Sequence, residues 1–200
     1  MTWVKVCGLR TMAEVEVAET AGVDAIGLVL IESSPRALTR EQARELSSNA
    51  SVPMIVLTQD LTPSDLIDLL GDVGAHGAQP YGDHSASAAA AIASNGGMAL
   101  LPIRVREPVD LANVPSGVLP LLDGHSSDAM GGTGTVVATE WLPRSGERYV
   151  LAGGLTPGNV AEAVNTIAPW GVDASSGLES SPGVKDPQRI RAFIEEAKNA

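Results

Sequence analysis

Two side chains able to transfer protons stand at the ends of two apolar runs that lie far apart in the chain. Cys7 comes near the end of VKVCG at residues 4–8, and Asp123 ends GVLPLLD at residues 117–123. A thiolate can remove a carbon-bound proton where neighbouring cations or dipoles lower its pKa. A carboxyl group in a partly dehydrated site has a raised pKa that suits a general acid. The pair predicts acid–base chemistry, with the alternatives that Cys7 is a small buried hydrophobe and Asp123 a loop or capping residue.

Glycine-rich segments in the last third of the chain predict a phosphate site. They read GGTG at residues 131–134, Gly153-Gly154, and SSG at residues 175–177. Glycine lets the backbone approach an anion closely and turn its N–H groups inward. A short helix after the last segment would add the positive end of its dipole. Each segment alone is typical of an ordinary turn, but the three together favour an anion site.

Three further polar side chains are candidates for holding a substrate. Arg36 lies in the loop after the second apolar run, and its guanidinium fork matches a carboxylate, although it could also be a solvated loop arginine. Gln79 and Asp173 lie at or near the ends of later runs, and Asp173 could instead bond to neighbouring backbone. The three histidines lack the spacing of metal ligands, and Cys7 is the only cysteine. We therefore expect no metal, no cofactor and no disulfide.

Eight short apolar runs must position these side chains, and helical patterns separate the runs. The runs are residues 4–8, 24–30, 53–58, 74–79, 99–105, 117–123, 149–154 and 171–176. Several do not alternate polar with apolar residues, which is typical of parallel strands buried on both faces. Helix starts are marked by capping boxes at Thr11 with Glu14 and Thr39 with Gln42, and by Thr62, Thr156 and Asp186 before prolines.

These elements predict an α/β fold, a (β/α)8 TIM barrel that forms one compact domain over residues 1–200. A doubly wound open sheet is the alternative. Its dinucleotide fingerprint is missing after the first run, where CGLR holds a single glycine. Because a TIM barrel carries its active site at the carboxyl ends of its strands, the fold predicts that the candidate side chains converge there.

The formal net charge of −11 argues against a nucleic-acid partner, which needs clustered Lys and Arg. It is compatible with one phosphorylated small molecule, because backbone N–H groups can hold a single phosphate on an acidic protein. The start MTWVKVCGLR is unlike a secretory signal. No apolar run approaches the ~18 residues of a membrane span. We therefore expect a cytoplasmic protein that binds neither nucleic acid nor membranes and is a monomer rather than an oligomer.

The sequence resembles the phosphoribosylanthranilate isomerase family of tryptophan biosynthesis. The similar segments follow one another in order: VKVCGL, SPR at 34–36, LLD at 121–123, GGTG at 131–134, LAGGLTPGNVAEA at 151–163 and VDASSGLESSPGVKD at 172–186. The resemblance implies an aldose–ketose isomerase that uses no cofactor. Its reaction would be the Amadori rearrangement of N-(5-phosphoribosyl)anthranilate to 1-(2-carboxyphenylamino)-1-deoxyribulose 5-phosphate.

The resemblance also implies a role for each candidate side chain. Cys7 would be the general base and Asp123 the general acid. Arg36 would contact the anthranilate carboxylate, and Asp173 would lie near the sugar hydroxyls or the bridging nitrogen. The phosphate would be held by the backbone around Gly132, Gly134, Gly153, Gly154, Ser175 and Ser176.

The middle of the chain departs from the family pattern. Thr58 and Gln59 stand where a V-F-V-N-like ending is usual, and Pro80 and Tyr81 stand where the family has L-H. We expect these changes on the anthranilate side of the pocket, where they would alter substrate affinity or breadth.

Two alternatives to the isomerase are a histidine-pathway or dual-substrate sugar isomerase and a non-catalytic phosphate-binding barrel. The sugar isomerase is the weaker alternative, because that family uses two aspartates and two phosphate sites. Here the first apolar run carries Cys7 near its end, and the glycine-rich segments indicate one phosphate site.

Overall fold

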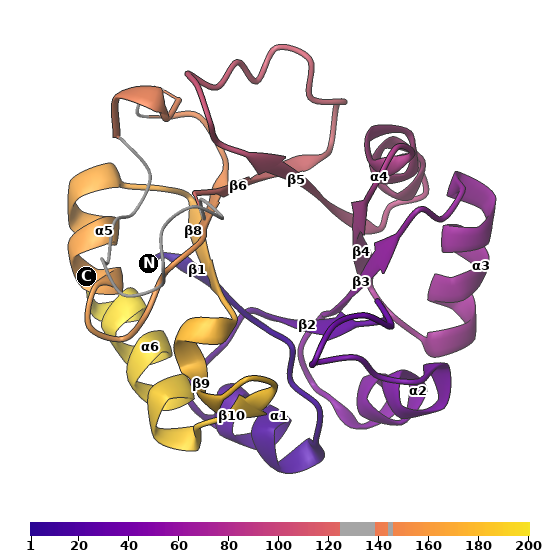
Figure 1. Cartoon of the computed structure of the whole chain (residues 1–200), viewed down its shortest axis with the longest axis horizontal. Helices are drawn as coiled ribbons and strands as arrows, with labels where there is room; N and C mark the ends of the chain where they lie inside the picture. The colour runs from indigo at the N-terminus through magenta and orange to yellow at the C-terminus, as the bar shows by residue number, and fades with distance from the viewer. Residues whose placement is uncertain (125–138, 144–145) are drawn as a thin grey trace.

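The computed structural model describes residues 1–124, 139–143 and 146–200. Eight parallel strands in these residues close into a barrel in which each strand pairs with the next and the last with the first (Figure 1). They are β1 (Trp3–Cys7), β2 (Ala25–Val29), β3 (Met54–Gln59), β4 (Gly77–Tyr81), β5 (Met98–Arg104), β6 (Leu119–Asp123), β7 (Val150–Ala152) and β8 (Gly171–Ala174). The predicted (β/α)8 barrel is confirmed.

Helices surround the barrel on its outer side (Figure 1). They are α1 (Met12–Thr20), α2 (Arg40–Asn49), α3 (Pro63–Val73), α4 (Ser85–Ser94), α5 (Val160–Ile167) and α6 (Pro187–Asn199). In the described part of the chain, no helix is long and apolar enough to cross a membrane. Shorter elements are the 3-10 helices η1 (Thr139–Trp141) and η2 (Ser176–Leu178) and the hairpin of β9 (Glu179–Ser181) with β10 (Val184–Lys185).

The expected helix between the fifth and sixth strands is missing. Residues 105–118, all of them described, form turns, bends and irregular segments instead. Pro108 and Pro115 lie within this connection, and each lacks the backbone N–H that a helix interior uses. The alternation of strands with helices is therefore interrupted at this point, while the strand order of the barrel is kept.

Most of the predicted helix starts are confirmed. Thr11 and Thr39 form complete capping boxes, and Thr62 accepts a hydrogen bond from the backbone N–H of Asp65. Asp186 caps α6 by accepting from two backbone N–H groups. The start predicted at Thr156 is wrong, because residues 157–159 form a turn and α5 begins at Val160.

Asn159 gives the reason for the late start of α5. Its side chain accepts a hydrogen bond from the Thr156 backbone N–H at 2.7 Å and donates one to the Gly154 carbonyl at 3.1 Å. Gly153 and Gly154 have φ values of 92° and 68°, so the chain leaves β7 in a conformation from which an α-helix cannot start directly. The turn held by Asn159 shapes the loop that is predicted to bind phosphate.

The fourth strand lies later in the chain than residues 74–79, its predicted position. Gly74 ends α3 with a left-handed conformation, φ 68°, and His76 precedes the strand. The Nδ1 atom of His76 accepts a hydrogen bond from the Met54 backbone N–H at 3.2 Å. The strand runs on through Pro80 and Tyr81. This shift brings Tyr81 to the mouth of the barrel.

Alternation along each strand divides the side chains between the barrel interior and the layer under the helices. On β1, Val4 and Val6 pack in the outer apolar layer, whereas Lys5 and Cys7 lie in the interior. The interior also holds an apolar cluster of Ala25, Ile55, Leu100, Leu121, Val150 and Ala152. Side chains two positions further along several of these strands therefore point into the mouth of the barrel.

Candidate active site

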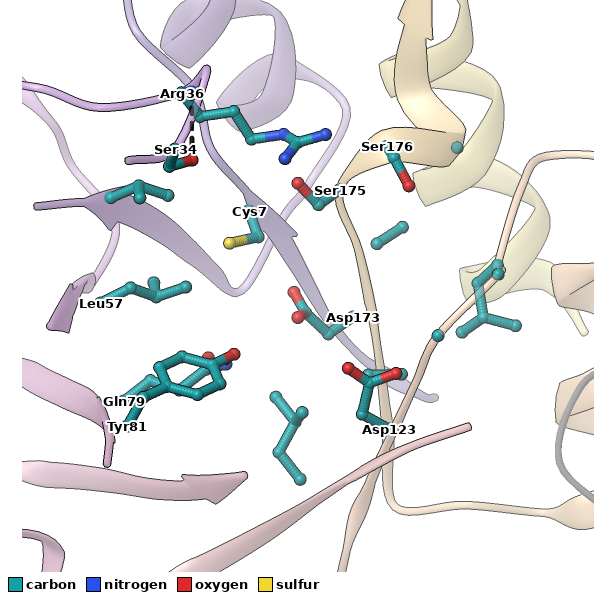
Figure 2. Close-up of a pocket in the computed structure, with 18 of the residues that line it drawn as sticks. Cys7, Ser34, Arg36, Leu57, Gln79, Tyr81, Asp123, Asp173, Ser175 and Ser176 are labelled. Atoms are coloured by element: carbon teal, nitrogen blue, oxygen red, sulfur yellow. Dashed lines mark hydrogen bonds between the residues drawn. The ribbon is translucent and has the colours of Figure 1, made fainter. Parts of the chain in front are cut away.

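A cavity of about 280 Å³ opens at the carboxyl ends of the strands. Its lining includes every described side chain or loop that was predicted to take part in binding or catalysis: Cys7, Arg36, Gln79, Asp123, Gly153, Gly154, Asp173, Ser175 and Ser176. In Figure 2, Gln79 and Tyr81 lie at the lower left and Asp173 and Asp123 at the lower right, and Cys7 lies above both pairs. Gly132 and Gly134 lie outside the described residues.

Cys7 lies at the end of β1, opposite Gly27 in the register of β2. A Cβ atom on Gly27 would come within 2.8 Å of the Cys7 Sγ, so the glycine makes room for the thiol. The residue is 4% exposed. Burial raises the thiol pKa, and this effect outweighs the lowering by Lys5, Lys185 and Arg36. The cations that a thiolate requires are present, but the thiol pKa in the free protein is raised rather than lowered.

Lys5 is a member of the site that sequence reasoning missed. Its side chain is fully buried, and its Nζ donates to Asp173 Oδ1 and to Gln79 Oε1, both at 3.0 Å. Burial lowers the pKa of this ammonium, but the attraction of Asp173 and Cys7 outweighs burial and leaves the pKa raised. A signal was present in the sequence, because a lysine two positions before Cys7 on one strand must share its face.

Arg36 is held by an internal carboxylate. Its Nε and Nη2 donate to the two oxygens of Glu179, at 2.5 and 2.8 Å. Lys185 donates to Oε1 of the same carboxylate at 2.9 Å, and the Gly183 backbone N–H donates to Oε2 at 3.2 Å. Burial would raise the pKa of Glu179, but the hydrogen bonds from Arg36 and Lys185 hold it at about 2. The predicted carboxylate clamp is therefore partly occupied before any ligand binds.

Two neighbouring segments fix the place of Arg36 and its loop. A Cβ on Gly8, whose φ is 80°, would lie 2.6 Å from the Arg36 Cδ, so the arginine stem packs directly on this glycine. A Cβ on Gly183 in the β9–β10 hairpin would lie 2.4 Å from the Pro35 carbonyl oxygen. The sequence patterns did not predict this hairpin. It packs directly against the loop that carries Arg36, and its residue Glu179 pairs with the Arg36 guanidinium.

Gln79 and Tyr81 form the opposite wall of the cavity. The Gln79 Nε2 donates to the Tyr81 hydroxyl at 2.7 Å, while its Oε1 accepts from Lys5. Burial raises the pKa of Tyr81 far above its ordinary value, so this hydroxyl keeps its proton. Of the residues that depart from the family pattern, Tyr81 lines this cavity. Thr58 instead lines a separate cavity beside α2 and α3, so its expected place on the substrate side is wrong.

The loops after β7 and β8 meet at the other end of the cavity. Gly154 has open space around a Cβ, so its positive φ, and not a close contact, is what favours glycine there. A Cβ on Gly177 would lie 2.0 Å from the Leu155 carbonyl oxygen, which shows how closely the two loops approach. The Ser175 carbonyl accepts from Lys185 Nζ at 2.9 Å. TIM barrels often carry a phosphate site at the loops after these two strands.

Comparisons with known proteins agree with this geometry. The sequence profile of the N-(5'phosphoribosyl)anthranilate (PRA) isomerase family matches residues 4–196. The N-(5'-phosphoribosyl)anthranilate isomerase of Rubrobacter xylanophilus is 35% identical over the full length of both chains.

Solved structures give the same relationship. The crystal structure of TrpF from Jonesia denitrificans superposes with a TM-score of 0.85 at 34% identity, over 100% of this chain and 98% of that one. A phosphoribosyl anthranilate isomerase in complex with reduced 1-(o-carboxyphenylamino)-1-deoxyribulose 5-phosphate superposes with a TM-score of 0.81 at 25% identity over both full chains. The chain therefore belongs to the N-(5'-phosphoribosyl)anthranilate isomerase family.

Proposed function

We propose that Cys7 and Asp123 perform the family's isomerisation in the cavity at the mouth of this barrel. The function of the chain is that of its family, an aldose–ketose isomerase acting on N-(5'-phosphoribosyl)anthranilate in tryptophan biosynthesis. The observation that carries the assignment of residues is that Cys7, Asp123 and the loops after β7 and β8 line one cavity. A thiol and a carboxyl group on separate strands can then act on one substrate held by its phosphate.

In the proposed reaction Asp123 gives a proton to the furanose ring oxygen, which opens the ring to a Schiff base. The Cys7 thiolate then removes the proton from sugar C2, and the electron pair of that bond moves toward the nitrogen to form an enolamine. The enolamine tautomerises to the ketone, so that C1 is reduced and C2 oxidised within the same molecule. Proton transfer alone completes the change, as general acid–base catalysis permits.

The substrate phosphate is proposed to lie against the backbone N–H groups of Gly153, Gly154, Ser175 and Ser176. Positive φ angles at the two glycines turn their N–H groups in a way that few other residues allow. Their loops are tied down, by Asn159 on one side and by Lys185 on the other. A prearranged loop binds an anion without a large cost in conformational entropy.

The substrate carboxylate is proposed to face Arg36. Because Glu179 occupies Nε and Nη2, the guanidinium would offer its Nη1 edge to the ligand. Asp173 is proposed to contact the sugar hydroxyls or the bridging nitrogen, and Gln79 completes the binding wall with Tyr81. A monomeric state and a cytoplasmic location stay predictions. Size-exclusion chromatography with light scattering would test the first of them.

The test is turnover by the purified protein, followed by the loss of phosphoribosylanthranilate fluorescence. We expect Cys7→Ser and Asp123→Asn each to lower kcat by about 10²–10⁴-fold with unchanged circular dichroism. Asp68→Asn, an exposed change on α3, is the matched control and should keep the wild-type rate. Absence of turnover by folded wild-type protein would refute the activity, and wild-type rates in both site variants would refute the acid–base assignment.

A further inference from the structure

A fully buried lysine lies in the barrel interior directly behind the proposed base. Lys5 and Cys7 are two positions apart on β1, so their side chains share the interior face of the strand. The Lys5 ammonium reaches Asp173 on the neighbouring strand β8 and Gln79 on β4, both at 3.0 Å. An ammonium has three N–H donors, and these two contacts use two of them. Cys7 is, after Asp173, the second group whose charge raises the pKa of this ammonium.

Burial of the Lys5 ammonium costs folding free energy, so its presence at this position needs an explanation. Moving an ammonium out of water into the interior of a barrel is expensive even when a carboxylate compensates it. A methionine of similar length would fill the same space without that cost. Charged groups retained at such positions are concentrated at functional sites. Both hydrogen-bond partners of the Lys5 ammonium, Gln79 and Asp173, line the cavity.

We propose that Lys5 is a positioning residue for the isomerisation, whose ammonium holds the negative charge on Cys7 Sγ after the thiol has lost its proton. The inference rests on the proposed function, in which Cys7 is the base that takes the proton from sugar C2. Lys5 would not touch the substrate. It would act through the thiolate, and it would also keep Asp173 and Gln79 in place around the cavity.

The charged and titratable groups around Cys7 show why Lys5 matters most among them. Lys5 has the largest lowering effect on the thiol pKa, ahead of Lys185 on β10 and Arg36 in the loop after β2. Asp173 on β8 raises the thiol pKa, and Tyr81 on β4 faces the thiol as well. Without Lys5, the thiolate would meet both burial and the uncompensated carboxylate of Asp173. An opposite charge within about 4–6 Å of a titratable group changes its pKa by about 1–3.

The experiment uses the fact that Cys7 is the only cysteine of the chain. Iodoacetamide, a neutral reagent that reacts with thiolates, then reports the ionisation of Cys7 directly and without any turnover. In Lys5→Met we expect the midpoint of the alkylation rate against pH to rise by about 1–3, and the acid limb of kcat to move with it. The KM should change less than kcat. Lys198→Met removes a cation that pairs with Asp24 outside the cavity, and should leave the midpoint unchanged.

A second comparison keeps the test valid if Lys5→Met does not fold. Asp173→Asn removes the buried carboxylate, and the double variant Lys5→Met/Asp173→Asn then removes both members of the ion pair, which proteins tolerate better than the loss of one. The midpoint should be higher in the double variant than in Asp173→Asn alone. An unchanged midpoint in a folded Lys5→Met, or no difference in the second comparison, would overturn the proposal. If Lys5→Met shifts the midpoint but the folded wild type shows no turnover, the effect of Lys5 on the thiolate is supported and the proposed activity is refuted.

Discussion

Replacement of Glu179 by glutamine tests the charge cluster that holds Arg36. The carboxylate accepts hydrogen bonds from Arg36, Lys185 and the Gly183 backbone, and its side chain is only 5% exposed. Glu179→Gln keeps the shape of the side chain but removes the charge that compensates two cations. Loss of one member of a buried ion pair leaves the remaining charges without compensation, which is strongly destabilising.

The magnitude follows from the pKa of Glu179. This pKa is about 2, whereas the ordinary value is 4.5. A difference of about 2.5, at about 1.4 kcal/mol per pKa unit, corresponds to about 3.5 kcal/mol of folding free energy. Because the pKa is lowered in the folded protein, this stabilisation is complete above about pH 5 and is lost as the pH falls toward about 2.

The assay is urea unfolding followed by circular dichroism over a range of pH. At about pH 6 the free energy of unfolding of Glu179→Gln should be about 3.5 kcal/mol lower than that of the wild type, and the difference should shrink toward zero near pH 2. Comparing the two proteins at each pH cancels the titration of the other carboxyl groups. Glu195→Gln, an exposed change on α6, should show little difference at any pH. A difference for Glu179→Gln that stays constant with pH would refute the reasoning, because it would show a loss of shape rather than of charge.

Two further substitutions test the walls around the reacting groups. Gly27→Ala places a Cβ 2.8 Å from the Cys7 Sγ, so it should displace the thiol and lower kcat by about tenfold or more with little change in KM. An unchanged kcat would show that the thiol position is not critical. Tyr81→Phe removes the hydroxyl that accepts from Gln79. Since Lys5 can only donate, Gln79 must turn its amide N–H toward Tyr81, and the tyrosine proton is free to reach the substrate. Steady-state kinetics should show KM raised about fivefold to tenfold, and an unchanged KM would exclude a substrate contact.

Features with a local physical cause were predictable from the sequence. The caps at Thr11, Thr39, Thr62 and Asp186 depend on side chains within three residues of the helix start, and all four are confirmed. The exception is Thr156, whose backbone N–H donates to the Asn159 side chain, while that side chain donates to the carbonyl of Gly154. The helix start predicted at Thr156 failed because residues 157–159 form a turn at the mouth of the barrel, and α5 begins only at Val160.

The contacts that hold the site together come from residues far apart in the chain. Glu179 meets Arg36 across 143 positions, and Asp173 meets Lys5 across 168, so no local pattern announces either pair. The register of β1 with β8 is what places Lys5 beside Asp173. The prediction of Arg36 as a clamp for a substrate carboxylate was therefore incomplete, because it did not include Glu179.

The sequence by itself determined which chemical groups this protein can use: a single thiol, a carboxyl group at the end of an apolar run, and glycine-rich loops suited to an anion. Residue type alone decides which atoms can carry a proton or hold a phosphate. Only the closed barrel decided that these groups share one cavity, that the buried Lys5 pairs with Asp173, and that the hairpin glutamate Glu179 holds Arg36. The physical reason is that burial and electrostatic compensation depend on distances in space, which strand pairing and register set only once the chain has folded.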